Sequence, residues 1–324
     1  MIELSVALIT YNSEDYIEET LESILKQKSS FNFEIVVGDD CSTDNTFEII
    51  QSYKHKYPEK FNIQKNNTQL GILKNFKSTI DRCIGNFVFN FDGDDIIKNE
   101  SAFQKLITVF KNNPDLGFVD SGYDKFFESK NRTEFYVNKD TIRASKNDYR
   151  DYIFLGRVIP IGTCFNRALL TKFVNFETYI NKNITIEDYP ILVDMAANCD
   201  FERIDESLFT YRIHDRSYSH NKGFERYFFQ REQMLNLFNY FKAKYNFNQK
   251  LCHDYEQKHY RTLIHLAGSY QKKNLGKDMF SKIKLKNSYD IIHYLSSQYK
   301  IIRSLAEIRK IKNSILLRIR LLFK

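Results

Sequence analysis

The chain has 324 residues, enough for one large domain or two smaller ones with a substantial core. It is 42% apolar and 27% charged, with only 11 Gly and 4 Pro, which is typical of a soluble globular protein and excludes fibrous or largely disordered classes. The net charge is +7, but residues 300–324 alone contain eight basic side chains against Glu307, so the remainder is neutral and a uniformly basic nucleic-acid surface is not expected.

No stretch of the chain predicts a membrane span or a secretion signal. A run of about 18 apolar residues does not occur. The N-terminal segment lacks the basic region and small-residue cleavage site of a signal peptide. The cysteines form no C-x-x-C pair, which favours reduced thiols over disulfides or a zinc site; they are Cys41, Cys83, Cys164, Cys199 and Cys252. We therefore expect a cytoplasmic protein.

Strand and helix patterns alternate through the first 120 residues. Apolar runs predict strands at residues 4–10, 33–40, 61–65, 86–91 and 116–122. Helical spacing of apolar residues predicts helices after residue 13 and at residues 42–53, 71–84 and 99–112. The expected cap of the first helix is Ser13 or Asn12, and that of the second is Ser42 or Thr43.

This alternation predicts an α/β fold with a Rossmann-like, mainly parallel sheet and helices on both faces. Ligands of such sheets bind beyond the carboxyl ends of the strands. Three polar segments directly follow predicted strands: TYN after the first, GDDCSTD after the second and DGDD after the strand at 86–91. We expect all three on the same rim of the sheet.

The pattern changes after residue 120. Residues 121–220 are less regular and contain two dense stretches, IEDYPILVDMA and YRIHDRSYSH. From about residue 224 the apolar spacing is helical. We therefore predict three parts, an α/β domain at 1–220, a helical extension at 221–299 and a basic segment at 300–324.

The segment FDGDD places three carboxylates, those of Asp92, Asp94 and Asp95, within four residues. A hard cation such as Mg²⁺ or Mn²⁺ prefers carboxylate oxygens together with phosphate oxygens of a substrate, and Gly93 would let a phosphate approach the backbone. A solvated turn is the alternative, because Asp-Gly is common in turns. A calcium loop of the EF-hand type is excluded, since Ile97 stands where that loop needs glycine.

Other acidic and histidine positions also allow two interpretations. Asp39 and Asp40 follow a strand and could bind a base or ribose group, or cap a helix. Asp188, after Glu187, could be a general base facing a cleft or an acid in the first turn of a helix. His214 lies among charged and hydroxyl residues, which fits a metal ligand or an exposed loop. Neither G-x-G-x-x-G nor G-x-x-x-x-G-K-S/T occurs, so dinucleotide cofactors and phosphate-loop chemistry are disfavoured.

The order of these motifs resembles that of the family 2 glycosyltransferases. SVALITYNSEDYIEETLESILKQ, EIVVGDDCSTDNTFEII, GILKN, FDGDD, IEDYPILVDMA and YRIH follow one another between about residues 3 and 220. The resemblance implies the GT-A fold, with a nucleotide-sugar part at about 1–120 and an acceptor part at about 121–220. It also implies a metal-dependent, inverting transfer, with a UDP-sugar as the expected donor.

The resemblance implies donor-binding roles for residues at the first strand ends. Thr10 and Tyr11 match positions that contact the nucleotide base and ribose. Asp40 matches the aspartate that hydrogen-bonds the uracil ring. Lys74 resembles a basic residue near the base, although an arginine is more usual there.

The resemblance also implies metal and catalytic roles. Asp92, Gly93 and Asp94 match the D-x-D motif, in which Asp94 would bind Mn²⁺ or Mg²⁺ and Asp92 would lie nearer the ribose or a metal-bound water. Asp188 matches the catalytic base. His214 matches a histidine that completes the metal or diphosphate site.

The C-terminal segment has a separate pattern. Apolar residues recur at helical spacings with basic residues between them: Ile301, Leu305, Ile308, Ile315, Ile319 and Leu322. A helix of these 25 residues would be about 37 Å long. A basic amphipathic helix suits an anionic membrane surface, and packing on its own domain or on a second subunit is the alternative.

Together these observations predict an enzyme of cell-surface polysaccharide or glycolipid synthesis. Its partners would be a nucleotide-sugar donor, a saccharide or lipid-linked saccharide acceptor, and the inner face of the plasma membrane as a peripheral site. The C-terminal helices could also pair in a homodimer. A membrane-associated module that binds a nucleotide sugar without catalysis is the alternative, and nucleic-acid binding is not expected.

Overall fold

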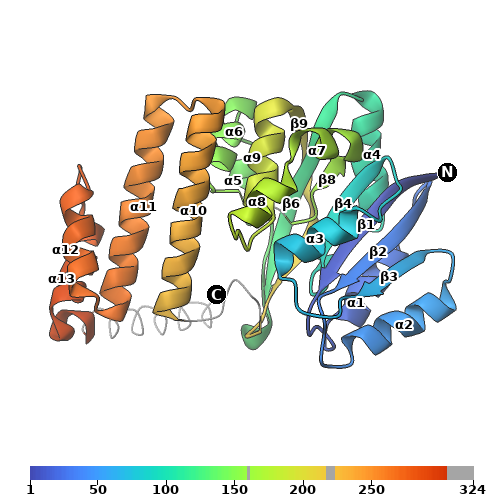
Figure 1. Cartoon of the computed structure of the whole chain (residues 1–324), viewed down its shortest axis with the longest axis horizontal. Helices are drawn as coiled ribbons and strands as arrows, with labels where there is room; N and C mark the ends of the chain where they lie inside the picture. The colour runs from blue at the N-terminus through green and yellow to red at the C-terminus, as the bar shows by residue number, and fades with distance from the viewer. Residues whose placement is uncertain (159–160, 217–222, 305–324) are drawn as a thin grey trace, which may run out of the picture. The chain divides into compact units, whose positions relative to one another are not determined.

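The computed structural model describes residues 1–158, 161–216 and 223–304 (Figure 1). The chain divides into two compact units, Met1–Asn221 and Lys222–Lys324. The first is a mixed α/β unit, and the described residues of the second are helical. The predicted fold class is therefore confirmed.

The first unit alternates strands and helices as predicted. The strands are β1 (Ile2–Thr10), β2 (Asn32–Asp39), β3 (Phe61–Lys65), β4 (Phe87–Asp92), β5 (Ile96–Ile97), β6 (Leu116–Phe127), β7 (Arg132–Glu134), β8 (Cys164–Asn166) and β9 (Asp200–Ile213). The helices are α1 (Ile17–Leu25), α2 (Thr46–Lys56), α3 (Ile72–Ile80), α4 (Ala102–Asn112), α5 (Lys139–Ile142), α6 (Lys146–Phe154), α7 (Arg167–Phe173), α8 (Phe176–Asn181) and α9 (Asp188–Asn198), with a 3₁₀ turn at Glu128–Lys130.

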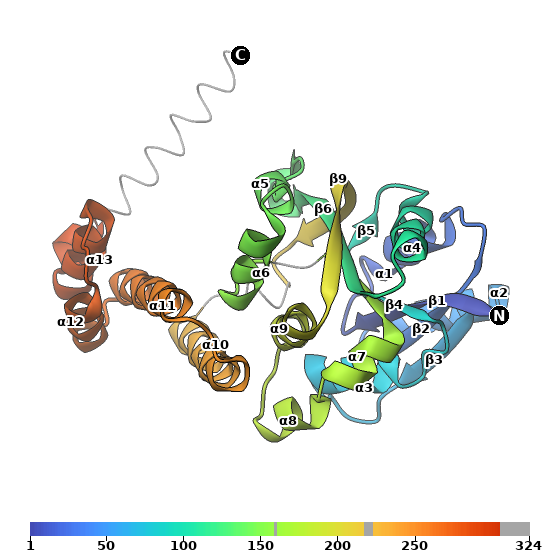
Figure 2. The same ribbon diagram turned by 90° about the horizontal axis from the view of Figure 1, so that it is seen from above.

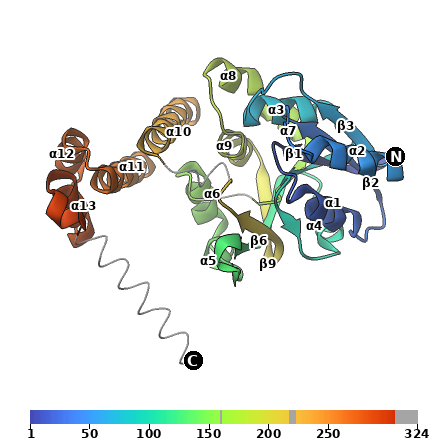
Figure 3. The same cartoon turned by 90° about the horizontal axis from the view of Figure 1, so that it is seen from below.

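The strands of this unit form one curled, mainly parallel sheet in the order β3-β2-β1-β4-β8-β6-β9-β5, with β7 paired to β6. The first four strands in this order run parallel, as do β6 and β9, whereas β5, β7 and β8 pair antiparallel with their neighbours. Helices α1 and α4 cover one face, and α3 and α7 cover the other (Figures 2 and 3). This is the arrangement that strand–helix alternation predicts.

The expected helix caps are wrong. Helix α1 has Tyr16 and α2 has Asn45 at the N-cap, and neither side chain makes a capping hydrogen bond. The side chain of Ser42 bonds Asp39 instead, and the backbone N–H of Ser13 donates to Oγ1 of Thr46 at 2.7 Å. These polar residues tie the loops after β1 and β2 to each other, which a local capping pattern does not reveal.

Register brings the carboxyl ends of three strands to the same edge. Thr10 of β1 pairs with Asp39 of β2, and Ile9 pairs with Asp92 of β4. The polar segments TYN, GDDCSTD and DGDD therefore begin at one rim, as the sequence predicts.

Aromatic packing fixes β9 beside this rim. The ring of Phe209 on β9 lies 5.3 Å from that of Phe89 and 6.0 Å from that of Phe91, both on β4 (centroid distances). All three side chains are at most 2% exposed. The residues that follow Phe209 on β9 are consequently held next to the turn that follows Phe91.

The second unit contains α10 (Phe224–Tyr245), α11 (Gln249–Tyr270), α12 (Lys273–Lys282) and α13 (Ser288–Gln298). Helices α10 and α11 form an antiparallel hairpin (Figure 1). Its turn contains Asn246 at φ 49°, and Asn248 caps α11 by accepting a hydrogen bond from the backbone of Leu251 at 2.8 Å. A core cluster joins α11 and α12 through Leu263, Ile264, Leu266, Met279 and Ile283.

Within residues 1–158, 161–216 and 223–304, none of the helices has both the length and the apolar character needed to cross a bilayer. Most of the predicted basic helix, residues 305–324, lies outside the described residues. Its amphipathic character, the membrane location and the homodimer stay predictions. The assignment of donor and acceptor roles to residues 1–120 and 121–220 also stays a prediction.

Candidate active site

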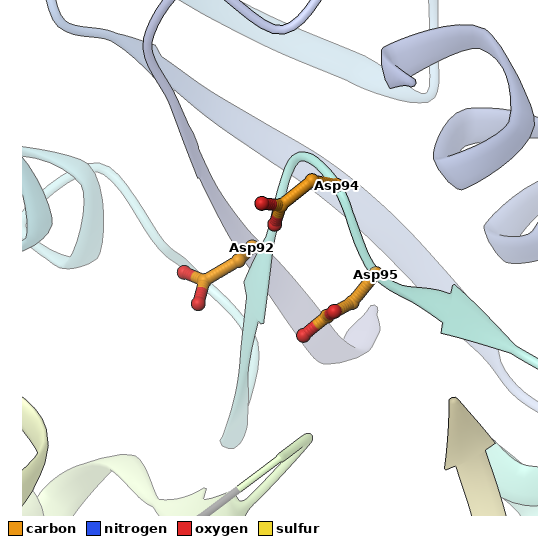
Figure 4. Close-up of side chains that lie close together, drawn as sticks. All are labelled: Asp92, Asp94 and Asp95. Atoms are coloured by element: carbon orange, nitrogen blue, oxygen red, sulfur yellow. The ribbon is translucent and has the colours of Figure 1, made fainter. Parts of the chain in front are cut away.

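The centre of the candidate site is the turn between β4 and β5. Carboxylate oxygens of Asp92, Asp94 and Asp95 lie within 4.8 Å of one another, and the three side chains leave the turn on the same side (Figure 4). Gly93 packs against the end of β1: a Cβ at this position would lie 2.5 Å from Oγ1 of Thr10 and 2.7 Å from its Cβ. Glycine is therefore required here by close packing between two strands.

The three carboxylates repel one another, and burial and this repulsion together raise the pKa values of Asp92 and Asp95. Burial, followed by the charges of Asp94 and Asp188, raises the pKa of Asp92 to about 7. Burial, followed by the charges of Asp94 and Asp92, raises the pKa of Asp95 well above its usual range. Three converging carboxylates with concentrated negative charge are the donor set that a hard divalent cation prefers. The residues present therefore fit Mg²⁺ or Mn²⁺.

Strand β9 supplies the other wall of this turn. The backbone N–H of Arg212 donates to Oδ1 of Asp95, and its Nε donates to the carbonyl oxygen of Asp94, each at 2.9 Å. Its guanidinium also pairs with Glu19 on α1. Arg212 thus ties the acidic turn to two other elements, and its side chain is only 7% exposed.

His214 follows Arg212 at the end of β9. Its Nε2 lies 2.9 Å from Oδ2 of Asp94. Its ring lies 4.2 Å from that of Tyr16 (centroid distance), and the hydroxyl of Tyr16 donates to Glu128 at 2.9 Å. Burial and the hydrogen bond to Glu128 raise the pKa of Tyr16 to about 12, so this hydroxyl stays protonated and keeps its donor role.

The first turn of α9 brings two more carboxyl groups to the same region. Asp188 is the first residue of α9, and its Oδ1 accepts a hydrogen bond from the backbone of Tyr189 at 2.6 Å. Its charge acts on Asp92, which places it near the end of β4. Burial raises the pKa of Asp188. The pKa of the preceding Glu187 is raised well above its usual range by burial and then by the charges of Asp188 and Asp92. A hydrogen bond with Asn90 on β4 opposes this shift.

The carboxylate of Asp40 already has backbone partners. It accepts hydrogen bonds from the N–H groups of Leu70 and Gly71 at 2.7 and 2.8 Å, and from the side chain of Asn66 at 3.1 Å. Asp40 thus holds the loop that opens α3 at the rim. Lys74, one turn later in α3, is exposed.

The two predicted base-contacting residues at the end of β1 and directly after it differ in exposure. Thr10 is 6% exposed, and its Oγ1 has no hydrogen-bond partner among the described residues. Tyr11 is 43% exposed. Of the two side chains, that of Tyr11 is therefore the more accessible to a ligand at the rim.

Sequence reasoning assigned no role to Arg212 or Tyr16. A signal for Arg212 was present in YRIH, because alternate residues of a strand point to the same face and Arg212 precedes His214 by two positions. Tyr16 had no such signal, since its contact with His214 joins residues that lie far apart in the chain. The functional roles of all the predicted site residues stay predictions, but the structure brings Asp92, Asp94, Asp188 and His214 into one region.

Comparisons with known proteins show the family and the fold of the chain. The sequence profile described as Glycosyl transferase family 2 matches residues 5–175, more than half of the chain. Poly(ribitol-phosphate) beta-N-acetylglucosaminyltransferase TarS of Staphylococcus aureus is 40% identical over 102 residues, 31% of this chain and 18% of that protein. Abequosyltransferase RfbV of Salmonella typhimurium is 28% identical over 167 residues, 50% of each chain. The chain thus spans at most half the length of these curated relatives.

Solved structures show the same fold. The crystal structure of S. aureus TarS 1–349 in complex with UDP-GlcNAc superposes with a TM-score of 0.60 at 17% identity, over 92% of this chain and 91% of that one. Mannosyltransferase PcManGT from Pyrobaculum calidifontis, in complex with GDP-Man and Mn²⁺, superposes with a TM-score of 0.53 at 12% identity, over 95% and 84%. These neighbours are glycosyltransferases, and their likeness to the chain is one of fold.

Proposed function

The chain belongs to glycosyl transferase family 2 and is a glycosyltransferase, and we propose that it moves a sugar from UDP to an acceptor hydroxyl with inversion at the anomeric carbon. The observation that carries this proposal is the convergence of the DGDD turn, His214 and the start of α9. It supports the proposal because carboxylates that could bind a cation and a separate candidate base lie in one region. UDP is proposed as the nucleotide because TarS, the relative of similar fold, is described in complex with UDP-GlcNAc.

Asp94 and Asp92 would hold a divalent cation, with His214 against Asp94. A neighbouring structure that contains Mn²⁺ supports the choice of cation. When bound, such a cation supplies a Lewis acid that offsets charge on a diphosphate leaving group. Arg212 and Asp95 contribute by fixing the backbone of the turn, so that the carboxylates of Asp92 and Asp94 are oriented before the donor arrives.

Asp188 would act on the acceptor. As the acceptor oxygen forms its bond to the anomeric carbon, the bond from that carbon to the diphosphate breaks and its electron pair leaves with the diphosphate. The hydroxyl proton passes to the carboxylate of Asp188. A positioned base of this kind contributes roughly 10²–10⁴ in rate. A single displacement inverts the anomeric centre.

We propose a saccharide or lipid-linked saccharide of the cell surface as the acceptor. Support comes from the named relatives, which include a poly(ribitol-phosphate) N-acetylglucosaminyltransferase and an abequosyltransferase. The alternative is a module that binds a nucleotide sugar without transferring it. The position of Asp188 near Asp92 favours catalysis, because binding alone needs no base.

The test is calorimetric titration of UDP with Mn²⁺ and then with EDTA, using wild type, Asp94→Asn and the surface control Asp115→Asn, which removes an exposed carboxylate of the same unit. We expect binding that needs both the metal and Asp94, with Asp115→Asn like wild type. Binding of UDP that ignores EDTA and Asp94 would contradict the metal assignment. Binding without transfer to any saccharide acceptor would support the non-catalytic alternative.

A further inference from the structure

Helix α13 exposes its two isoleucines to solvent, although its Tyr294 packs on Phe280 of α12. The residues that it buries are polar: Asp290, His293, Ser296 and Ser297. Ile291 and Ile292 are 43% and 40% exposed, and Tyr289 is 52% exposed. A helix on a protein surface ordinarily has the opposite arrangement, with its apolar stripe facing the core.

Close backbone packing explains which side of α13 is buried. A Cβ at Gly276 of α12 would lie 2.1 Å from Oγ of Ser297, and one at Gly268 of α11 would lie 2.7 Å from the carbonyl oxygen of His293. A side chain at either glycine would collide with α13, so the helices approach this closely only because both positions are glycine. An isoleucine in place of Ser297 would force α12 and α13 apart.

Hydrogen bonds fix the same orientation. The side chain of Gln298 donates to the carbonyl oxygen of Lys273 on α12 at 2.9 Å, and Asp290 and Asn287 form a capping box at the start of α13. Asp290 is also paired with Arg261 of α11 at 3.4 Å. These contacts hold the polar side of α13 against α11 and α12, and the isoleucines on the other side therefore face solvent.

The exposed apolar residues continue on both sides of α13. We define the α13 face as the six exposed large hydrophobic residues of this region, Leu285, Tyr289, Ile291, Ile292, Tyr299 and Ile301. Exposed lysines border them in the chain, at Lys284, Lys286 and Lys300. Asp290, the only acidic residue between positions 279 and 304, is fully buried. Residues 279–304 thus contribute exposed apolar and cationic side chains and no exposed acid.

We propose that the α13 face binds the surface of an anionic lipid bilayer. Lipid headgroups would meet the lysines, and the apolar side chains would enter the boundary between headgroups and acyl chains. Charge decides against two other occupants. A second copy would set like charges opposite one another, and the following segment of this chain, residues 305–324, carries six basic side chains against Glu307. This inference is independent of the donor site.

The experiment is flotation of the full chain with vesicles of phosphatidylcholine alone and of phosphatidylcholine mixed with phosphatidylglycerol. The variants are Ile291→Ser with Ile292→Ser, and Lys284→Gln with Lys286→Gln. The controls are Ile84→Ser, which alters an isoleucine of the first unit that is 64% exposed, and Lys250→Gln, which alters an exposed lysine of α11. Thermal unfolding and UDP binding verify that each variant is folded.

We expect wild type to float with the anionic vesicles and to bind neutral vesicles weakly. Each double variant should lower the partition coefficient by about tenfold or more, and both controls should leave it unchanged. Full binding by the folded isoleucine variant would overturn the proposal, since residues outside the face would then carry the contact. Dimerisation that this variant abolishes, without vesicle binding, would identify a second copy as the occupant. Binding of soluble polyphosphate but not of vesicles would identify an anionic polymer instead.

Discussion

The Nε2 atom of His214 lies 2.9 Å from Oδ2 of Asp94, although 120 residues separate them in the chain. The contact joins the end of β9 to the turn after β4. The ring of Tyr16, the N-cap residue of α1, packs against the histidine ring at a centroid distance of 4.2 Å. The D-x-D turn is therefore one part of a site whose other part is supplied by β9.

Removing this imidazole should weaken cation binding. In His214→Ala, Asp94 loses the side chain that orients its carboxylate. If the imidazole binds the cation directly, the variant also loses one ligand of the cation. We expect the affinity for Mn²⁺ in the presence of UDP to fall at least about tenfold. Titration followed by Mn²⁺ electron paramagnetic resonance measures this affinity. His55→Ala, which removes an exposed histidine of α2, is the control, and equal affinities for both variants would show that His214 has no part in the site.

Arg212 should act as a positioning residue. Arg212→Lys keeps the charge but cannot donate from Nε to the carbonyl oxygen of Asp94 while also pairing with Glu19. A looser turn should raise the KM for the donor and lower the Mn²⁺ affinity about tenfold, with a smaller effect on kcat. The matched control is Arg216→Lys, at an exposed arginine four residues later. A purely structural role would lower the melting temperature and leave the KM of the folded fraction unaltered.

Asp188→Asn should separate donor binding from transfer. The amide cannot accept the acceptor proton, so turnover should fall by about 10²–10⁴. The calorimetric affinity for UDP and Mn²⁺ should stay close to that of wild type. Glu177→Gln, an exposed carboxylate on α8, should retain full turnover. Unchanged turnover in Asp188→Asn would remove this residue as the base.

Asp120 should give the first unit a measurable dependence on pH. The carboxyl group is 2% exposed on β6 and hydrogen-bonded by Tyr149, and burial raises its pKa to about 6. Since the folded state holds this proton more tightly than the unfolded state, the contribution of Asp120 to the free energy of unfolding is largest below about pH 4 and declines as the pH rises to about 6. The decline is at most about 3 kcal/mol, from a shift of about two pKa units.

Asp120→Asn keeps an oxygen acceptor for Tyr149 and has no proton to lose. As the pH rises from about 4 to about 6, the free energy of unfolding of wild type should therefore fall relative to that of this variant. Urea denaturation at several pH values measures it. Asp115→Asn, on the surface before β6, should show no such shift, and parallel pH profiles for wild type and Asp120→Asn would contradict the prediction.

Local sequence patterns determined most of the α/β unit. The alternation of strand and helix patterns and the position of DGDD after a buried strand follow from periodicities that each segment carries by itself. The shared rim of β1, β2 and β4 follows from the parallel sheet that this alternation predicts. The predicted caps were wrong because both serines bond across the two loops: the backbone N–H of Ser13 donates to Thr46, and the hydroxyl oxygen of Ser42 accepts from the backbone N–H of Asn12. Strand β6 also continues to Phe127, five residues beyond the predicted strand, because it pairs there with β7 and β9.

Tertiary packing decided the rest. The sequence placed Arg212 and His214 in a polar stretch, but pairing of β9 with β5 and β6, together with the packing of Phe209 on Phe89 and Phe91, brings β9 to the acidic turn. Helix α13 shows the same limit: its isoleucines lie outside because its polar side packs closely on Gly268 and Gly276. A segment's own residues set its periodicity and therefore its secondary structure. Which of its sides is buried, and which distant residues it meets, depends on the shape and charge of the segments packed against it.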